Sequence, residues 1–258
     1  MSNVVMVTGA SAGVGRSLAH RFAAEGFDIV AVARRRELLD TLASEIESEY
    51  GKRVTPVCAD LAEPGAAERV YDEVRALEVS VLINNAGIGD WNYAWDVGID
   101  RLHSMIDLNV RALAVFSVLF AQDNKDNDAQ LINVASAAGY ALFVGAAPYS
   151  ATKFFVTALT EGIEHDLQAT GGTMRAKLLV PGPIDTEFTA VSLSESKFPR
   201  RGTSKVKFHT PDEIADFTYQ LYESDRVVGI VDTTDMSFHL GNHVHPTARL
   251  TKSQTDKP

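Results

Sequence analysis

Cysteine is almost absent from this chain of 258 residues, in which Cys58 is the only one. A single cysteine can form neither an internal disulfide nor a cysteine-based zinc site, and this composition suits a reducing cytoplasm. The sequence also lacks a basic, apolar leader at its start. It has no uncharged apolar run of the roughly 18–20 residues that a bilayer span needs. We therefore expect a cytoplasmic protein without a membrane segment.

An excess of positive charge is absent as well. The chain has 24 Lys and Arg against 34 Asp and Glu, a formal net charge of −10. This charge opposes contact with phosphate groups, so we expect no binding to nucleic acid or to an anionic membrane. The hydrophobic share of 45% is that of a globular protein and too high for a disordered one. The length alone allows one large domain or two small ones.

Short apolar runs rich in β-branched residues alternate with longer amphipathic stretches. The runs are almost continuously hydrophobic, which is typical of parallel strands covered on both faces. They occupy residues 4–7, 29–33, 54–58, 79–83, 131–134, 176–180 and 227–231. Helical patterns lie between them, the last three over 101–122, 150–170 and 211–223. With no linker or repeat, this predicts one doubly wound α/β domain over residues 1–246 with a seven-stranded parallel sheet, and a flexible polar tail over 247–258.

A glycine-rich turn follows the first predicted strand. Residues 8–15 read T-G-A-S-A-G-V-G and lead into a helix. Small residues let the backbone approach a pyrophosphate, and a helix N-terminus offers unpaired N–H groups to an anion. The G-x-x-x-G-x-G spacing differs from the common dinucleotide fingerprint, and a turn that binds nothing is the alternative. The strand–turn–helix context favours nucleotide binding.

The residues at the end of the second predicted strand indicate which dinucleotide, NAD(H) or NADP(H), the chain would bind. An acidic residue there would hold the ribose hydroxyls of NAD, but the strand ends at Ala33 and continues with Arg34, Arg35 and Arg36. Guanidinium groups bind phosphate through charge-assisted, bidentate hydrogen bonds. We predict NADP(H) in preference to NAD(H), with Arg34 as the main contact to the 2′-phosphate. The alternative, a merely basic helix start, would oppose the helix dipole.

Polar residues follow other strands at the same predicted edge. Asp60 comes after the third strand, where it would face the adenine amino group or cap a helix starting near Pro64. An N-N-A-G sequence at 84–87 follows the fourth strand and Ser136 follows the fifth. Tyr149 and Lys153 are four residues apart, on one face of a helix. Each pattern is weak alone, but together and in this order they indicate one active site.

At this point the sequence resembles the short-chain dehydrogenase/reductase (SDR) family, in its compact branch of about 250 residues. The resemblance runs from Val4 to about Val231. It rests on the glycine-rich turn, N-N-A-G, Asn109, Ser136, Y-S-A-T-K at 149–153 and P-G-P-I-D-T at 181–186. It implies a Rossmann-like fold.

The resemblance also implies roles for single residues. Tyr149 would be the general acid/base, Ser136 would steady the substrate oxygen, and Asn109 would hold a water in a proton relay. Lys153 would bind the nicotinamide ribose and lower the pKa of the tyrosine. The implied cofactor contacts are Gly9, Ser11, Ala12, Gly13, Val14, Gly15, Arg34, Arg35, Asp60, Leu61, Asn85, Ala86, Gly87, Tyr149, Lys153, Pro181, Gly182, Ile184 and Thr186. Ala12 stands where many NADP-using relatives have a basic residue, a departure that weakens the cofactor prediction.

The side chains predicted to line the substrate pocket indicate what kind of substrate it would take. Trp91, Tyr140 and Phe143 would line the pocket beside Ser136 and Tyr149, and residues 186–210 would form a mobile substrate lid. This lining predicts a small hydrophobic ketone, aldehyde or secondary alcohol. Trp91 is equally compatible with a core or subunit contact. We expect no metal, because the histidines, including His243-x-His245, show no convincing ligand spacing.

Three functions compete on these residues. The first is an NADP(H)-dependent carbonyl reductase or alcohol dehydrogenase. The second is a non-catalytic NADP-sensing or scaffold protein on the same fold, which would have no need of Tyr149. The third is the nucleotide-sugar epimerase branch, for which this chain lacks a second substrate lobe. The resemblance further implies a homodimer or homotetramer, joined through the long helices, while the segment 232–258 departs from the family pattern.

Overall fold

An eight-stranded sheet forms the centre of the computed structural model, which describes residues 3–188 and 208–246. The strand order is β3-β2-β1-β4-β5-β6-β7-β8. The strands are β1 (Val4–Thr8), β2 (Asp28–Ala33), β3 (Val54–Cys58), β4 (Val81–Asn84), β5 (Gln130–Val134), β6 (Arg175–Val180), β7 (Val228–Val231) and β8 (Phe238–Gly241). The seven predicted strands all form and pair in parallel.

The eighth strand corrects the predicted number of seven. β8 turns back on β7 and pairs with it antiparallel. No apolar run marks this strand in the sequence, because β8 is an edge strand whose side chains are only partly buried. Phe238 supplies its main packing contact, stacking on Phe217 with the ring centroids 4.4 Å apart. Part of the segment that departs from the family pattern is therefore a sheet edge.

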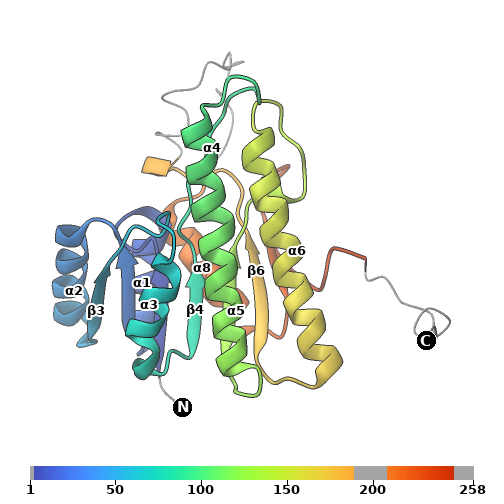
Figure 1. The fold of residues 1–258 in the computed structure, drawn as a ribbon. Helices are drawn as coiled ribbons and strands as arrows, with labels where there is room; N and C mark the ends of the chain where they lie inside the picture. Colours follow the sequence, from blue (N-terminus) through green and yellow to red (C-terminus); the bar gives the residue numbers. More distant parts are fainter. Residues whose placement is uncertain (1–2, 189–207, 247–258) are drawn as a thin grey trace.

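Helices cover both faces of the sheet (Figure 1). One face carries α1 (Gly13–Ala24), α2 (Arg36–Tyr50) and α8 (Pro211–Glu223). The other carries α3 (Ala66–Val74), α5 (Leu113–Asn124) and α6 (Ala147–Thr170). Shorter pieces are η1 (Arg75–Leu77), α4 (Ile99–Ile106), the π-helix η2 (Asp107–Ala112) and η3 (Ala137–Gly139). This is the predicted doubly wound arrangement.

The core lies between the sheet and these two helical layers. Phe22 of α1 is fully buried and packs edge-on against Tyr219 and Tyr222 of α8. On the opposite face Phe116 and Phe120 of α5 are buried. Fully burying one such side chain contributes about 1.5–3 kcal/mol. These layers hold the strand ends, and with them the predicted site, in fixed positions.

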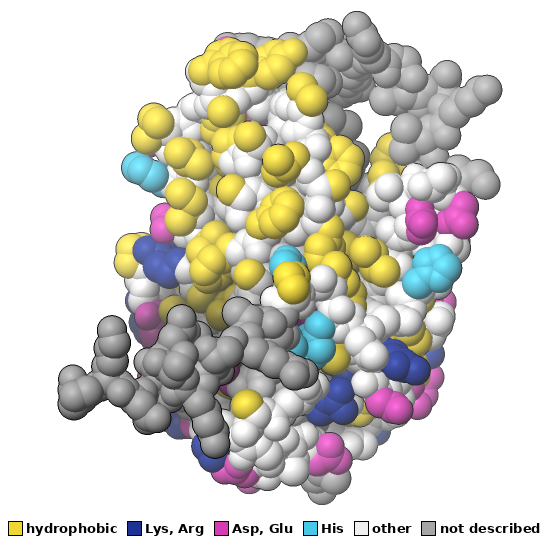
Figure 2. Space-filling model, turned by 90° about the vertical axis from the view of Figure 1, so that its right-hand side faces the viewer, with side chains coloured by type: hydrophobic (Ala, Val, Ile, Leu, Met, Phe, Trp, Pro, Cys, Tyr) yellow, Lys and Arg dark blue, Asp and Glu magenta, His cyan; other side chains and the backbone are white. Residues whose placement is uncertain are grey.

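The helical stretch Ile99–Asn124 is more apolar than the sequence analysis expected. By length and composition it is able to cross a membrane, and 39% of its apolar window is buried. A core helix of a soluble protein passes the same test. Figure 2 shows hydrophobic side chains gathered over the face that carries α6. Exposed hydrophobic residues on α5 and α6 include Val118 and Phe155.

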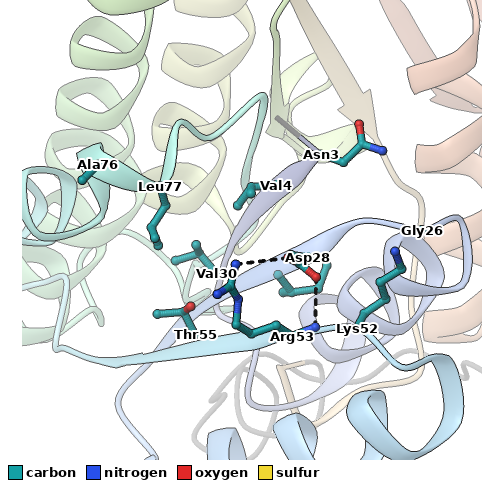
Figure 3. A pocket seen from close by; sticks show the side chains of 11 residues that line it. Asn3, Val4, Gly26, Asp28, Val30, Lys52, Arg53, Thr55, Ala76 and Leu77 are labelled. Atoms are coloured by element: carbon teal, nitrogen blue, oxygen red, sulfur yellow. Dashed lines mark hydrogen bonds and ion pairs between the residues drawn. The ribbon is translucent and has the colours of Figure 1, made fainter. Parts of the chain in front are cut away.

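The carboxyl ends of the parallel strands meet at one edge, which brings the predicted motifs together. The opposite edge holds a cavity of about 420 Å³, lined by residues such as Asn3, Val4 and Thr55 (Figure 3). There Arg53 donates a backbone and a side-chain hydrogen bond to Asp28. No motif residue lines this cavity. Ligands of open α/β sheets bind at the carboxyl edge, so the site is built there.

Candidate active site

The glycine-rich turn between β1 and α1 has a backbone that side chains would obstruct. Gly9 and Gly13 have φ angles of +73° and +53°, and a Cβ at Gly15 would overlap the carbonyl oxygen of Gly9. Ala12 stands at the N-cap of α1 and offers no side-chain cap. The first N–H groups of α1 therefore stay available to an anion. This turn fits the pyrophosphate of a dinucleotide.

The N-N-A-G motif is fastened to the end of β1. The backbone N–H groups of Asn85 and Ala86 both donate to Thr8 Oγ1 at 3.0 Å, and Asn85 Nδ2 donates to the carbonyl of Thr8 at 3.0 Å. A Cβ on Gly9 would lie 3.0 Å from the Cα of Ala86. The motif thus forms one wall beside the glycine-rich turn, in the position predicted for cofactor contact.

The three arginines after β2 point to different partners. Arg35 lies beside the glycine-rich turn, with Nε and Nη2 3.3 and 3.2 Å from Ser11 Oγ. Arg34 is exposed over 70% of its side chain, and its Nη1 lies 3.7 Å from Asp60 Oδ2. Arg36 bonds Asp40 within α2. The structure therefore brings Arg35 to the glycine-rich turn, while the predicted contact of Arg34 with a 2′-phosphate stays a prediction.

Asp60 and Leu61 follow β3. Asp60 Oδ1 accepts a hydrogen bond from the N–H of Ala62 at 3.0 Å, so it closes a local turn. The N-cap of α3 is Gly65, with no side-chain cap, so the alternative that Asp60 caps this helix is wrong. Asp60 Oδ2 faces Arg34, and its contact with adenine stays a prediction. Leu61 is buried in the core with α3. Any contact of Leu61 with a cofactor stays a prediction.

Ser136, Tyr149 and Lys153 come together between β5 and α6. Pro148 lies in the first turn of α6, a position where proline is well tolerated, and Tyr149 follows it in the same turn. Tyr149 and Lys153 are 4% and 5% exposed. Ser136 is hydrogen-bonded with Tyr149 and accepts a bond from the N–H of Ala138 at 3.2 Å. Lys153 Nζ donates to the carbonyl of Val134 at 2.9 Å and lies 5.9 Å from the Tyr149 ring centroid.

Asn109 lies in the π-helix η2, a type of helix that often marks functional sites. Its Oδ1 accepts from the N–H of Ile88 at 2.9 Å, and its Nδ2 donates to the carbonyl of Ile88 at 2.8 Å. Nδ2 also lies 3.2 Å from Thr152 Oγ1. A Cβ on Gly87 would lie 3.2 Å from Asn109 Oδ1 and 3.7 Å from Lys153 Nζ. Gly87 thus marks where N-N-A-G, Asn109 and Lys153 meet.

Burial sets the protonation of the two central groups. It raises the pKa of Tyr149 to about 12, against the opposite effect of the hydrogen bond with Ser136. It lowers the pKa of Lys153 to about 8. Burial therefore dominates the pKa of Tyr149 in this arrangement, and the expected lowering of that pKa by Lys153 stays a prediction. Removing the phenolate from water outweighs other effects, and the ammonium ion is itself disfavoured by burial.

Aromatic rings surround the Tyr149 hydroxyl region. Trp91 lies 6.3 Å from Tyr149 and 6.1 Å from Phe143, measured between ring centroids, and Phe188 lies 6.0 Å from Tyr149. Trp91 and Phe143 thus lie where substrate lining was predicted. Tyr140 does not, because its hydroxyl bonds Glu161 at 2.5 Å and its ring stacks on His245. Tyr140 anchors the segment after β8 instead.

The segment 181–188 passes from β6 over the glycine-rich turn. Pro181 is buried, and a Cβ on Gly182 would lie 3.1 Å from Val231. Ile184 forms an isolated bridge with His209. Thr186 Cγ2 lies 3.4 Å from the position of a Cβ on Gly13. Ile184 and Thr186 are therefore brought to the cofactor edge, while residues 189–207 of the predicted lid lie outside the described residues, as does the predicted tail over 247–258.

Comparison with known proteins decides the family. The family described as short chain dehydrogenase matches residues 3–197 of this chain. The match includes β1 to β6 and the helices between them, and ends before α8, β7 and β8.

The chain belongs to the short-chain dehydrogenase family.

Its relatives carry oxidoreductase names. Sulfoacetaldehyde reductase 2 of Chromohalobacter salexigens is 36% identical over 196 residues, which are 74% of this chain and 76% of the relative. The NADP-dependent 3-hydroxy acid dehydrogenase of Schizosaccharomyces pombe is 30% identical over 256 residues, 93% and 95% of the two chains. A short-chain dehydrogenase from Sphingobium yanoikuyae, solved in complex with NADPH, aligns with a TM-score of 0.76 at 29% identity and covers 88% of this chain and 86% of its own. This short-chain dehydrogenase is a nicotinamide-dependent oxidoreductase.

Two residues at this site were not predicted from the sequence. Glu187 forms an ion pair with Arg35 at 3.2 Å, and Phe188 packs on Tyr149. Both directly follow P-G-P-I-D-T and fell inside the predicted lid, so their place along the chain was the available signal. Their separate contacts required the three-dimensional arrangement of this short-chain dehydrogenase.

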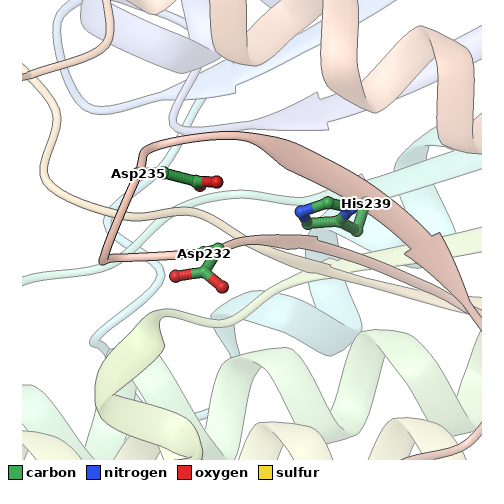
Figure 4. Close-up of side chains that lie close together, drawn as sticks. All are labelled: Asp232, Asp235 and His239. Atoms are coloured by element: carbon green, nitrogen blue, oxygen red, sulfur yellow. The ribbon is translucent and has the colours of Figure 1, made fainter.

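One group of possible metal ligands occurs among the described residues. Asp232, Asp235 and His239, around the β7–β8 turn, place ligand atoms within 4.8 Å of one another (Figure 4). All three are exposed. The aspartates accept local hydrogen bonds, Asp232 from the N–H of Thr234 and Asp235 from the N–H of Ser237. These bonds form the turn, and we assign no metal to it.

Proposed function

We propose that this short-chain dehydrogenase is an NADP(H)-dependent carbonyl reductase or alcohol dehydrogenase. It would transfer hydride reversibly between NADPH and a small hydrophobic ketone or aldehyde, with a secondary alcohol as substrate in reverse. The observation that carries the proposal is the buried pair Tyr149 and Lys153 with Ser136 beside Tyr149, next to the rings of Trp91 and Phe143. Hydrogen-bonding groups at one carbon–oxygen bond and an apolar surround suit such a substrate.

The residues divide the work on the substrate oxygen. NADPH, when bound, supplies the hydride. Tyr149 remains a protonated phenol at neutral pH, since its pKa is about 12, and donates its proton to the developing alkoxide. Ser136 donates a hydrogen bond to the same oxygen in the manner of an oxyanion hole.

Lys153 is placed to hold the cofactor ribose. Within the described part of the chain its Nζ makes one hydrogen bond, to the carbonyl of Val134. An ammonium group has three donors, so N–H groups remain for ribose hydroxyls next to Gly87. Asn109, fixed by Ile88, borders the same space and would hold the water of a proton relay.

Arg34 and Arg35 support the preference for NADP(H). In the sequence, two arginines directly follow β2, at the place where an acidic residue would favour NAD(H). The Schizosaccharomyces pombe relative is named NADP-dependent, and the Sphingobium yanoikuyae structure contains NADPH. Ala12 is the one position named above that departs from this preference, since many NADP-using relatives have a basic residue there.

The test is NADPH turnover over a panel of ketones and aldehydes with wild type and Tyr149→Phe. The variant keeps the ring but loses the proton donor, so we expect kcat to fall by about 10²–10⁴ while NADPH affinity, measured by fluorescence titration, is unchanged. Tyr219→Phe is the matched control, because that ring of α8 packs on Phe22 and Arg21 of α1, away from the site. Retained turnover in Tyr149→Phe would contradict the mechanism. NADPH binding without turnover of any substrate would favour the non-catalytic sensor.

The partner and location predictions also stay proposals. We propose that the apolar face over α5 and α6 binds a second copy of this chain, giving a homodimer or homotetramer, because it exposes apolar residues from two adjacent long helices (Figure 2). Light scattering of the purified protein measures this, and a monomer would exclude it. Cytoplasmic location remains a prediction from the single cysteine.

A further inference from the structure

Three consecutive residues after β6 touch three parts of the cofactor edge. Thr186 lies over Gly13 of the glycine-rich turn. Glu187 pairs with Arg35 at the end of β2. Phe188 packs on Tyr149, with ring centroids 6.0 Å apart. The middle residue is a carboxylate at the place where a 2′-phosphate is expected, which the proposed function does not explain.

Arg35 is held from two sides. Its Nε and Nη2 face Ser11 Oγ, and its Nη1 faces Glu187 Oε2 at 3.2 Å. The side chains of Arg35 and Glu187 are 49% and 69% exposed, so a ligand can reach both. Arg34 has a longer and looser pairing, with Asp60 at 3.7 Å. Of the two arginines, Arg35 is therefore the one whose charge is already engaged beside the turn.

A 2′-phosphate and the Glu187 carboxylate are competing anions. Both seek the same guanidinium donors, and the phosphate carries the higher charge and makes the stronger bidentate contact. If the phosphate binds Arg35, Glu187 loses its counter-ion and is repelled by the new charge. NAD(H) has no 2′-phosphate and leaves the Arg35–Glu187 pair intact. The cost of displacing Glu187 thus falls on NADP(H) alone.

We infer that Glu187 is a specificity-determining residue, the resident counter-ion of Arg35 that competes with the 2′-phosphate of NADP(H). The inference rests on the proposed function for the identity of the cofactor. Glu187 weakens NADP(H) binding without affecting NAD(H), and so sets the margin by which the enzyme distinguishes the two.

The experiment measures binding rather than turnover. Fluorescence titration gives the Kd of NADPH and of NADH for wild type, Glu187→Gln, Arg35→Ala and the double variant. For Glu187→Gln we expect NADPH to bind about two- to fivefold more tightly, the range of an exposed ion pair, with NADH unchanged. In the Arg35→Ala background the same substitution has no effect on NADPH. Glu37→Gln, which removes an exposed carboxylate from the first turn of α2, controls for a general change of charge.

The outcomes separate this inference from the proposed function. An unchanged or weakened NADPH affinity in Glu187→Gln overturns it, as does an equal shift for NADH, a gain that persists without Arg35, or the same gain in Glu37→Gln. In each of these cases wild type would still bind and use NADPH, and the proposed function would stand. Wild type that binds NADPH no better than NADH, or does not turn it over, is instead a failure of the proposed function.

Discussion

The two ends of the cofactor edge are built from different kinds of interaction. At the adenosine end, Arg34 and Arg35 are exposed and pair with exposed carboxylates across 3.2–3.7 Å. At the reactive end, Tyr149, Lys153 and Asn109 are at most 5% exposed and are held by hydrogen bonds. Exposed ion pairs contribute about 0–1 kcal/mol and are screened by salt, whereas a buried charge is costly and strongly coupled to its surroundings. Cofactor choice is therefore adjustable in small steps, and the chemistry is not.

The largest expected effect is at the reactive end. Lys153→Met removes a buried ammonium 5.9 Å from the Tyr149 ring, where a unit charge is worth about 3 kcal/mol at an effective dielectric of 20, on the order of a hundredfold in rate. We expect kcat/KM for carbonyl reduction to fall by about that factor or more. Steady-state kinetics with NADPH measure it.

Lys177→Met is the matched control for this loss. Lys177 is also buried, but its Nζ donates to the carbonyls of Leu221, Tyr222 and Ser224 at the end of α8. This variant should lose stability and keep kcat in the molecules that remain folded. If kcat fell equally in Lys153→Met and Lys177→Met, the loss would come from removing any buried lysine, and Lys153 would have no special role in the reaction.

A smaller effect is expected at the adenosine end. Arg35→Ala should raise the Kd of NADPH about tenfold at low salt, as expected for one charge-assisted phosphate contact, and Arg34→Ala by less. NADH affinity should hardly change in either. Titrations at two ionic strengths check this, since the difference between wild type and variant should shrink at high salt. A larger effect of Arg34→Ala than of Arg35→Ala would instead support the prediction from the sequence that Arg34 is the main contact to the 2′-phosphate.

The smallest effect concerns stability against pH. Burial lowers the pKa of both Lys153 and Lys177 to about 8, below the ordinary value of 10.5. Between these values the unfolded chain binds more protons than the folded one, so the free energy of unfolding rises with pH from about 8 to 10. Urea unfolding at pH 8 and 9.5 should show a gain on the order of 1 kcal/mol per lysine. The gain should be smaller in Lys153→Met, and a loss of stability over this window would contradict the lowered pKa values.

Most of the fold could be predicted from the sequence because each buried parallel strand appears there as a continuous apolar run. All four residues of β4 are buried, and a run of that kind has no alternative place in a soluble domain. β8 was missed because an edge strand with exposed side chains has no such run. The π-helix η2 was likewise read as part of one continuous helix, since its residues do not differ in type from their neighbours.

The site was predicted by residue but not by side-chain direction. Gly15, Ser136, Tyr149 and Lys153 lie where the motifs indicated. The order of Arg34 and Arg35 could not be read, because which side chain turns toward Ser11 depends on backbone angles beyond the strand. The direction of the Tyr149 pKa shift also required knowledge of its burial, which spacing along a chain does not supply.

Because of the π-helix η2, the site depends on the number of residues in the segment Asp107–Ala112 as well as on their types. A π-helical turn holds one residue more than an α-helical turn, and each residue of an α-helix turns the chain by about 100°. Loss of one residue between Asn109 and α5, such as Val110, would restore ordinary helix and rotate Asn109 and everything before it by that angle relative to α5. Asn109 would then face away from Ile88 while Phe116 stayed in the core. Such a deletion would leave a well-folded domain in which Asn109 no longer borders the site, and with it the proposed water-holding role would be lost.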